Sequence, residues 1–382
     1  MRIGIITMHK VTNFGSALQA YALQKYIEDN ISDDVCLIDY EYPNKEHKRF
    51  IRSNQTILFR SLMLFVELVG SILKNRKKRQ ARYDFFYDKY FRLTEKTFHS
   101  NDEICKNPPL FDVYVTGSDQ VWNINTMNND SAFYLNFAPK GSFKISFGAC
   151  YSTSSVPERF LSEIKSYLSS YSRLGLREAS GVDFVKGLGL DSNIQIFNTC
   201  DPTLLLNKTT YDLIAKDSII NIEGDYILVY YLAYYNCEPA LSLLIEQAKA
   251  KFKCKVIFIG YRFIPYKGSY QYLTAIGPVE FLWLYSHAKF IISCSFHGTI
   301  FSIINRKPFY TIVPSDKDDN RSKDLLQITK LHERAIVSST RETLLNFDDP
   351  FTTEVLNAVD DYIQKSRDYL EFIKTFKEIK NI

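Results

Sequence analysis

The fold class is decided by the first 42 residues, MRIGIITMHKVTNFGSALQAYALQKYIEDNISDDVCLIDYEY (1–42). The apolar run at 1–8 predicts a buried strand, and the loop at 9–16 leads into a helix over about 17–29. VCLIDYEY, residues 35–42, predicts a second strand. A strand, a helix and a second strand in this order form a βαβ unit, which implies a parallel sheet with a right-handed crossover.

The same alternation continues to residue 200 and restarts after Pro202. In the first array, the further strands are predicted at 111–118, 144–151, 172–178 and 194–200, with helices at 157–170 and 178–187. In the second array, strands are predicted at 225–232, 254–261, 290–296 and 308–314, with helices at 237–252, 278–288 and after Gly298. Two such arrays imply an α/β protein with two doubly wound, Rossmann-like domains.

The chain length agrees with this division, because 382 residues at about 150 residues per domain favour two domains. We expect the first domain over 1–203 and the second over 204–345, facing each other across a cleft. Ligands of such sheets bind at the carboxyl ends of the strands. The tail, 346–382, contains a helical stretch at 351–378 and is expected to pack back on the first domain.

Composition excludes several classes of protein. Hydrophobic residues make up 46% and charged residues 24%, which excludes wholesale disorder and coiled coil. The net charge of +4 is too small to indicate a nucleic-acid-binding face. The seven cysteines are scattered without a C-x-x-C pair, so neither a disulfide framework nor a zinc site is indicated. With no secretory signal at the start, we expect a cytoplasmic protein without a metal or a bound cofactor.

The most apolar stretch is NQTILFRSLMLFVELVGSIL (54–73). Arg60 and Glu67 interrupt it, and its uninterrupted apolar run is too short to cross a bilayer. A basic run at 76–79 and Arg82 follow it. Segment 54–82 therefore suits peripheral contact with an anionic membrane, which would hold the protein at the inner face. A helix that packs on the first domain, with a solvated basic end, explains the same residues.

The loop at 12–16 is the first candidate for ligand binding. Asn13 lies before the predicted helix, and Gly15 lets backbone N–H groups approach a ligand at the positive helix start. A glycine turn in which Ser16 caps the helix explains the same residues without a ligand.

The second candidate is TGSDQVWN (116–123), which follows an apolar strand. A hydroxyl, a carboxylate, an amide and an indole close together suit a sugar, whose hydroxyls need paired partners and whose apolar face stacks on a ring. The residues concerned are Ser118, Asp119, Gln120 and Trp122. An Asx turn with a structural tryptophan is the alternative.

Two further candidates follow other strands. Arg177, in RLGLREAS (173–180), can grip a carboxylate or phosphate with its planar fork, although an ion pair at a helix start is the commoner role. His297, in SCSFHGTIFS (293–302), stands where a helix begins, so it is placed for proton transfer beside N–H groups that attract an anion. A structural histidine in a strand-to-helix loop remains the alternative.

A charged loop, DKDDNRSK (316–323), offers Arg321 and Lys323 as phosphate contacts, although a solvated loop explains its acidic residues. The chain has no H-E-x-x-H, G-x-S-x-G or Walker motif and no metal-ligand cluster of defined spacing.

Taken in order, these motifs resemble the polysaccharide pyruvyl transferase family from Met1 to about residue 335. The resemblance is carried by NFGSALQAYAL (13–23), TGSDQVWN (116–123), LREAS (176–180), DPTLLL (201–206) and SFHGTIFSI (295–303). It implies a fold similar to that of glycosyltransferase-B-type enzymes, with phosphoenolpyruvate as donor and a sugar diol, expected to be part of a lipid-linked glycan, as acceptor. The product would be a pyruvate ketal on a cell-surface or capsular glycan precursor.

The resemblance also implies roles for individual residues. His297 matches the proposed acid/base histidine of the family and Arg177 its donor-binding arginine. Many members carry an arginine two residues before the histidine, where this chain has Ser295. The donor side would then comprise Arg177, Ser295, Phe296, Gly298, Thr299, Arg321 and Lys323, and the acceptor side Asn13, Gly15, Ser118, Asp119, Gln120 and Trp122.

Two other functions fit the sequence. A nucleotide-sugar glycosyltransferase of the same architecture would need a pocket for a base and a ribose in the second domain. A non-catalytic, membrane-associated assembly protein would use segment 54–82 instead.

Overall fold

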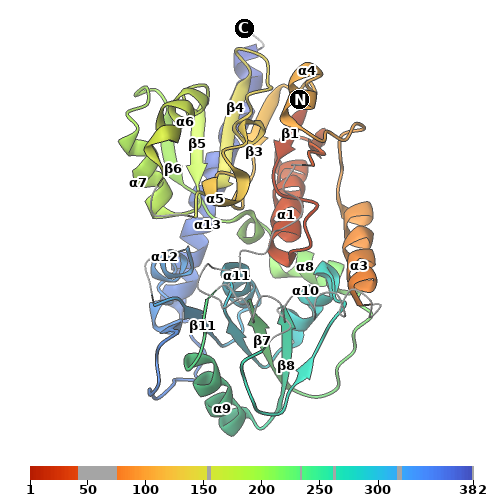
Figure 1. Cartoon of the computed structure of the whole chain (residues 1–382), viewed down its shortest axis with the longest axis vertical. Helices are drawn as coiled ribbons and strands as arrows, with labels where there is room; N and C mark the ends of the chain where they lie inside the picture. Colours follow the sequence, from red (N-terminus) through yellow and green to blue (C-terminus); the bar gives the residue numbers. More distant parts are fainter. Residues whose placement is uncertain (42–74, 153–155, 233–234, 261–263, 316–320, 381–382) are drawn as a thin grey trace, which may run out of the picture.

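The computed structural model describes residues 1–41, 75–152, 156–232, 235–260, 264–315 and 321–380. They form two six-stranded sheets, one above the other in Figure 1, in which every pair of neighbouring strands is parallel. The predicted fold class, two doubly wound α/β domains, is confirmed.

The first sheet has the strand order β2-β1-β3-β4-β5-β6, and the second has the order β12-β11-β10-β7-β8-β9. The strands of the first sheet are β1 (Ile3–Ile6), β2 (Val35–Leu37), β3 (Val113–Thr116), β4 (Phe143–Ala149), β5 (Arg173–Leu176) and β6 (Gln195–Asn198). Those of the second are β7 (Tyr226–Tyr231), β8 (Lys255–Gly260), β9 (Gln271–Tyr272), β10 (Phe290–Ser293), β11 (Phe309–Val313) and β12 (Ala335–Val337).

Helices connect the strands. In the first half they are α1 (Phe14–Asn30), α3 (Asn75–Tyr90), α4 (Asn101–Lys106), α5 (Ile124–Met127), α6 (Leu161–Leu168) and α7 (Ala179–Gly187). In the second half they are α8 (Lys208–Ala215), α9 (Ala240–Phe252), α10 (Pro278–His287), α11 (Phe296–Ile304), α12 (Arg321–Ile328) and α13 (Thr353–Lys380). Short 3₁₀ helices are η1 (Ser131–Tyr134), η2 (Glu158–Phe160), η3 (Pro202–Leu205) and η4 (His332–Arg334).

Helix α1 begins three residues before the predicted start. Asn13, not Ser16, is its N-cap, because the Asn13 side-chain oxygen accepts hydrogen bonds from the N–H groups of Gly15 and Ser16. Phe14 at the start of α1 packs against the second domain. Its ring centroid lies 4.8 Å from that of Phe281 and 5.8 Å from that of Tyr230.

Helix α13, blue in Figure 1, runs from the second domain along the first sheet. Tyr369 donates to the carbonyl of Ser146 in β4, and Ser366 accepts from the N–H of Cys200. Both contacts are buried, so the tail is bound to the first domain by specific hydrogen bonds as well as by apolar packing.

The order of the strands fixes where ligands can bind. In each sheet, the connections from two adjacent strands lead to opposite edges of the sheet. In the first sheet β1 connects to β2 on one side and β3 to β4 on the other, and in the second sheet β10 connects to β11 and β7 to β8 in the same way. A crevice opens beyond the carboxyl ends of such strands. The loops after these four strands therefore meet between the two domains.

The structure separates the basic run at 76–79 into three exposed residues and one that contacts the protein. Residues 42–74, which include most of segment 54–82, lie outside the described residues. In α3, residues 76–78 are exposed, whereas Arg79 donates to the carbonyl of Thr12 and lies over the ring of Phe14. Arg79 thus supports the loop before α1 instead of facing solvent.

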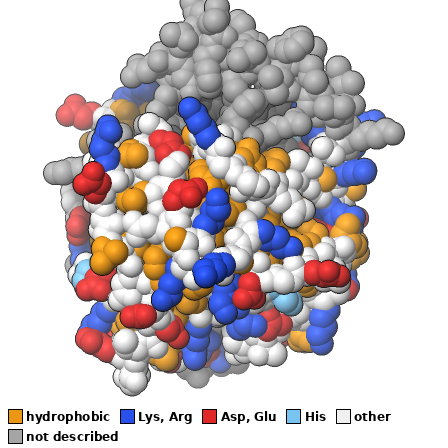
Figure 2. Space-filling model, turned by 90° about the horizontal axis from the view of Figure 1, so that it is seen from below, with side chains coloured by type: hydrophobic (Ala, Val, Ile, Leu, Met, Phe, Trp, Pro, Cys, Tyr) orange, Lys and Arg blue, Asp and Glu red, His pale blue; other side chains and the backbone are white. Residues whose placement is uncertain are grey.

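Two observations bear on membrane contact. No helix within the described residues is long and apolar enough to cross a membrane. Figure 2, which views the molecule from the side of the second domain, shows acidic and basic side chains mixed on that face.

Candidate functional site

A pocket lies between the domains, where the sheet topology requires one. The first domain contributes Asn13, Asp119 and Gln120, from the loops after β1 and β3. The second contributes residues from the loops after β7, β10 and β11 and from the starts of α11 and α12, namely Leu232, Tyr235, Cys294, Ser295, Phe296, His297, Pro314, Arg321 and Ser322. The structure thus brings together predicted residues as far apart in the sequence as Asn13 and Arg321.

His297 lies in the first turn of α11 and reaches across to the first domain. Its Nε2 is buried and lies 3.3 Å from Oδ2 of Asp201. Its ring packs against Gly15, where a Cβ would lie only 2.0 Å from Nδ1. Gly15 is therefore needed for the space that it leaves to the imidazole. Its N–H donates to the side chain of the N-cap Asn13 and is not available to a ligand.

Asp201 belongs to this candidate site, although the sequence did not single it out. It follows β6 and is the N-cap of η3, with Oδ1 accepting from the N–H and the hydroxyl of Thr203. Its Oδ2 accepts from Nη1 of Arg177 at 2.7 Å. The available signal was its place at the end of a strand, before a proline in DPTLLL.

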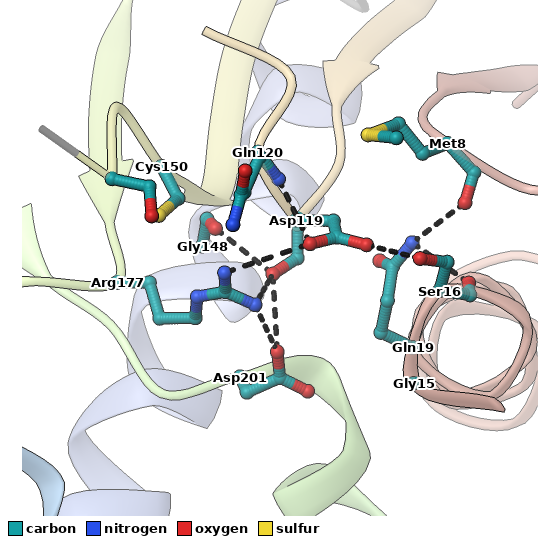
Figure 3. Close-up of polar contacts among 12 residues, drawn as sticks. Met8, Gly15, Ser16, Gln19, Asp119, Gln120, Gly148, Cys150, Arg177 and Asp201 are labelled. Carbon is teal, nitrogen blue, oxygen red and sulfur yellow. Dashed lines mark hydrogen bonds and ion pairs between the residues drawn. The ribbon is translucent and has the colours of Figure 1, made fainter. Parts of the chain in front are cut away.

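Arg177 lies beneath the pocket, with a side chain only 1% exposed. Its guanidinium extends between Asp201 and Asp119, as Figure 3 shows, with Nη2 3.7 Å from Oδ1 of Asp119. The guanidinium carbon also lies 4.6 Å from the centroid of the Phe296 ring. Arg177 does not line the pocket, so its fork holds the two carboxylates in this structure.

Asp119 joins this network to α1. The hydroxyl of Ser16 donates a short hydrogen bond to Oδ2 of Asp119, and the N–H of Gln120 donates to Oδ1. Asp119 has a φ of 74°, in the left-handed region. Such strain in a non-glycine residue persists only where the surroundings enforce it, and it is concentrated at functional sites.

Both carboxylates are held in the ionised form. Burial alone raises the pKa of Asp201, but the charges of His297 and Arg177 and a hydrogen bond from Thr203 bring it well below its ordinary value. Burial likewise raises the pKa of Asp119, and Arg177, His297 and Ser16 lower it overall. One negative charge, on Asp119, therefore lies in the lining of the pocket and a second, on Asp201, lies buried beneath it, beside the arginine and the histidine.

The opposite wall of the pocket suits an anion. Ser295 is the N-cap of α11, so the first turn of that helix opens on the pocket. Arg321 begins α12 and lies 5.8 Å from the ring of Phe296. Lys323, the other expected phosphate contact, is not among the lining residues.

Several predicted site residues belong to the core instead. Trp122 is 1% exposed, donates its indole N–H to the carbonyl of Phe133 and stacks on Tyr134. The structure therefore assigns it to the core of the first domain, and it cannot stack on an acceptor there. Ser118 and Thr299 are fully buried and hydrogen-bonded within the protein. Gly298 packs against Ser293, where a Cβ would clash.

The remaining arrangement can transfer protons and hold an anion. A histidine beside an ionised carboxylate can gain and lose a proton. An arginine and a helix start can neutralise a carboxylate or a phosphate. Asn13 and Gln120 offer polar side chains on the opposite side of the same pocket.

Comparison with solved structures places this fold. UDP-N-acetylglucosamine 2-epimerase from Rickettsia bellii matches with a TM-score of 0.51 at 11% identity, over 99% of this chain and 97% of that one. The enzyme of the same name from Methanocaldococcus jannaschii matches with a TM-score of 0.49 at 13% identity, over 95% of this chain and 93% of that one. At such identities the likeness concerns the fold alone, and the match to the Rickettsia bellii structure confirms the predicted glycosyltransferase-B type of fold.

Comparison of sequences identifies the family. No curated protein matches this sequence. The family model described as polysaccharide pyruvyl transferase matches residues 13–316, a span that includes Asp119, Arg177, Asp201 and His297. Because this span covers most of the chain, the protein belongs to the polysaccharide pyruvyl transferase family.

Proposed function

We propose that the protein transfers the enolpyruvyl group of phosphoenolpyruvate to two hydroxyls of a sugar, forming a pyruvate ketal on a precursor of a cell-surface or capsular glycan. The proposal is carried by one observation: His297, paired with the ionised Asp201, shares a pocket with an arginine and a helix start. The family membership supports transfer of a pyruvyl group in polysaccharide biosynthesis.

The donor would bind on the side of the second domain. Phosphoenolpyruvate carries a carboxylate and a phosphate, which need cations and N–H donors. The first turn of α11 and Arg321 supply both kinds of group in the lining of the pocket. Arg321 thus provides the cation that Ser295 lacks in comparison with many family members. Arg177 supports this wall from behind through the Phe296 ring.

The reaction then needs one proton donor and one proton acceptor. His297 protonates the methylene carbon of the donor, which becomes a methyl group, and C2 becomes electrophilic. A sugar hydroxyl attacks C2, its proton returns to the histidine, and the C2–O bond to phosphate breaks. A second hydroxyl then attacks C2 and closes the ketal, and its proton leaves with the phosphate or the solvent.

The acceptor would bind on the side of the first domain. Asn13, Asp119 and Gln120 line that part of the pocket and can pair with sugar hydroxyls. We propose a lipid-linked glycan as the acceptor and peripheral membrane contact through the start of α3, because exposed basic residues at 76–78 lie in its first turn. Such contact would place the enzyme at the cytoplasmic face of the membrane.

The test is incubation of the protein with phosphoenolpyruvate and a panel of lipid-linked glycans. We expect phosphate release together with a product whose mass corresponds to a pyruvate ketal. His297→Ala should lower turnover by about a hundredfold or more, because general acid/base catalysis typically contributes that much. Parallel reactions with nucleotide sugars separate this function from glycosyl transfer, since sugar transfer without use of phosphoenolpyruvate would contradict the proposal.

A further inference from the structure

We propose that Asp201 is a positioning residue that holds the Nε2–H of His297, so that the ring exchanges protons with the substrates through Nδ1. This inference rests on the proposed function for its catalytic meaning, but the pairing itself can be tested without substrate. It also makes the alignment of the histidine depend on both domains, because Asp201 belongs to the first and His297 to the second.

The carboxylate of Asp201 is itself fixed. Oδ1 accepts two hydrogen bonds from Thr203, and Oδ2 accepts from Arg177 at 2.7 Å and lies 3.3 Å from the hydroxyl of Ser118. The side chain of Asp201 has no exposed surface. The carboxylate is therefore held in one orientation, in which Oδ2 is shared between the guanidinium of Arg177 and the imidazole of His297.

The imidazole is fixed from the other sides. Nε2 is buried and makes no hydrogen bond of regular geometry within the described residues. Asp201, with Oδ2 3.3 Å away, is the anionic group at ion-pair distance from it in that part of the chain. A Cβ on Gly15 would lie 2.0 Å from Nδ1, 2.2 Å from Cγ and 2.5 Å from Cε1, so Gly15 lies against a face of the ring and leaves the in-plane lone pair of Nδ1 uncovered. The ring of Phe296 lies at 5.5 Å, inclined by 75°. Because His297 lines the pocket while Nε2 is turned away from solvent, Nδ1 is the nitrogen left for the substrates.

The consequence is a defined tautomer. An ionised carboxylate accepts hydrogen bonds only, and a lone pair on Nε2 would face the negative charge of Oδ2 at 3.3 Å, so the neutral ring carries its proton on Nε2. Nδ1 then holds the lone pair that takes a proton from a sugar hydroxyl. In the protonated ring, the Nδ1–H is the one that moves to the methylene carbon, and the electron pair of the N–H bond stays on the ring.

The first experiment observes the tautomer directly. Protein labelled with ¹⁵N-histidine is studied by long-range ¹H–¹⁵N NMR above the titration of the ring, and His297→Asn identifies the signal among the six histidines. We expect the proton on Nε2. Observation of the proton on Nδ1 would overturn the inference, whether or not the protein uses phosphoenolpyruvate.

The second experiment assigns the cause to Asp201. Asp201→Asn should shift the tautomer population and lower kcat by about a hundredfold or more, with less effect on the KM for phosphoenolpyruvate. The matched control is Asp119→Asn, which removes the other carboxylate beside Arg177 and should leave the tautomer unchanged. An unchanged tautomer in Asp201→Asn contradicts the inference. The wild-type NMR result decides the point even if that variant does not fold.

The two proposals can fail separately. If the Nε2–H tautomer depends on Asp201 and no ketal forms, the pairing stands and the proposed function is wrong. If the ketal forms and the proton lies on Nδ1, the function stands and the positioning role is wrong.

Discussion

Gly15 of the first domain and His297 of the second are packed so closely that a Cβ on residue 15 would lie 2.0 Å from Nδ1 of the imidazole. This contact exists because α1 and α11 both begin at the cleft, one from each domain. His297, the acid/base candidate, thus lies between the Gly15 backbone, which has no Cβ to obstruct the ring, and the carboxylate of Asp201.

Gly15→Ala should therefore impair the reaction strongly. The added methyl group overlaps the ring, so the imidazole must leave Asp201 or the domains must separate. We expect a fall in kcat of at least tenfold, measured by phosphate release. Gly187→Ala is the matched control, because nothing lies within 4 Å of the position of its Cβ. Equal activity in both variants would show that the cleft opens enough in solution for this contact not to matter.

Arg177→Lys should lose both stability and activity. Lysine keeps the charge but not the planar fork that pairs with Asp201 while lying over Phe296. We expect the free energy of unfolding to fall by about 1–3 kcal/mol, because buried groups lose hydrogen bonds. Urea denaturation measures this. The exposed Arg159, which also lies over a phenylalanine ring, provides the control Arg159→Lys, with a change within about 0.5 kcal/mol.

Trp122→Phe distinguishes a core role from an acceptor-binding role. Phenylalanine retains a ring beside Tyr134 but loses the hydrogen bond to Phe133, so we expect a loss of about 1–3 kcal/mol in the free energy of unfolding. The KM for the acceptor should remain unchanged. Trp283→Phe, at a partly exposed tryptophan of α10, should cost less. A raised KM for the acceptor with unchanged stability would contradict this prediction and indicate that Trp122 binds the acceptor.

The stability of the first domain should depend on Asp39. Burial raises its pKa, but hydrogen bonds from His9, Lys10 and Thr97 lower it well below its ordinary value. A carboxyl with a lowered pKa stabilises the fold above its unfolded pKa of about 3.9, and this contribution is lost as the pH falls further. Asp39→Asn should thus flatten the acid side of the stability curve, measured by urea denaturation from pH 7 to 3. Asp183→Asn, at an exposed site, should leave the curve unchanged.

The sequence predicted the sheets well because buried parallel strands are continuous apolar runs, and each predicted strand from 111–118 to 308–314 overlaps an observed one. Short strand β12 and edge strand β9 were missed, since three and two residues give no periodicity. The helix start at Phe14 was placed late because an asparagine cap and a serine cap look alike in sequence.

The candidate site was predicted only in part. His297, Asp119 and Gln120 were identified from their places after strands, which the topology alone determines. Trp122 was misassigned because sequence cannot tell toward which side of a loop an indole turns. The pairing of Asp201 with His297 joins residues from different domains, so no local pattern contains it.

The last prediction concerns the membrane. Residues 76–78 in the first turn of α3 are exposed and basic, and each such residue contributes about 1 kcal/mol near an anionic surface. We expect the protein to sediment with anionic liposomes at low salt, and substitution of all three by glutamine to weaken binding by about a hundredfold. Arg79 is left intact, because it supports the loop before α1.

Substitution of the exposed Lys216, Lys251 and Lys253 removes the same charge elsewhere and should have little effect. Equal losses in the two triple variants would mean that net charge alone attracts the protein, and no binding by the wild type would leave α3 a purely structural helix.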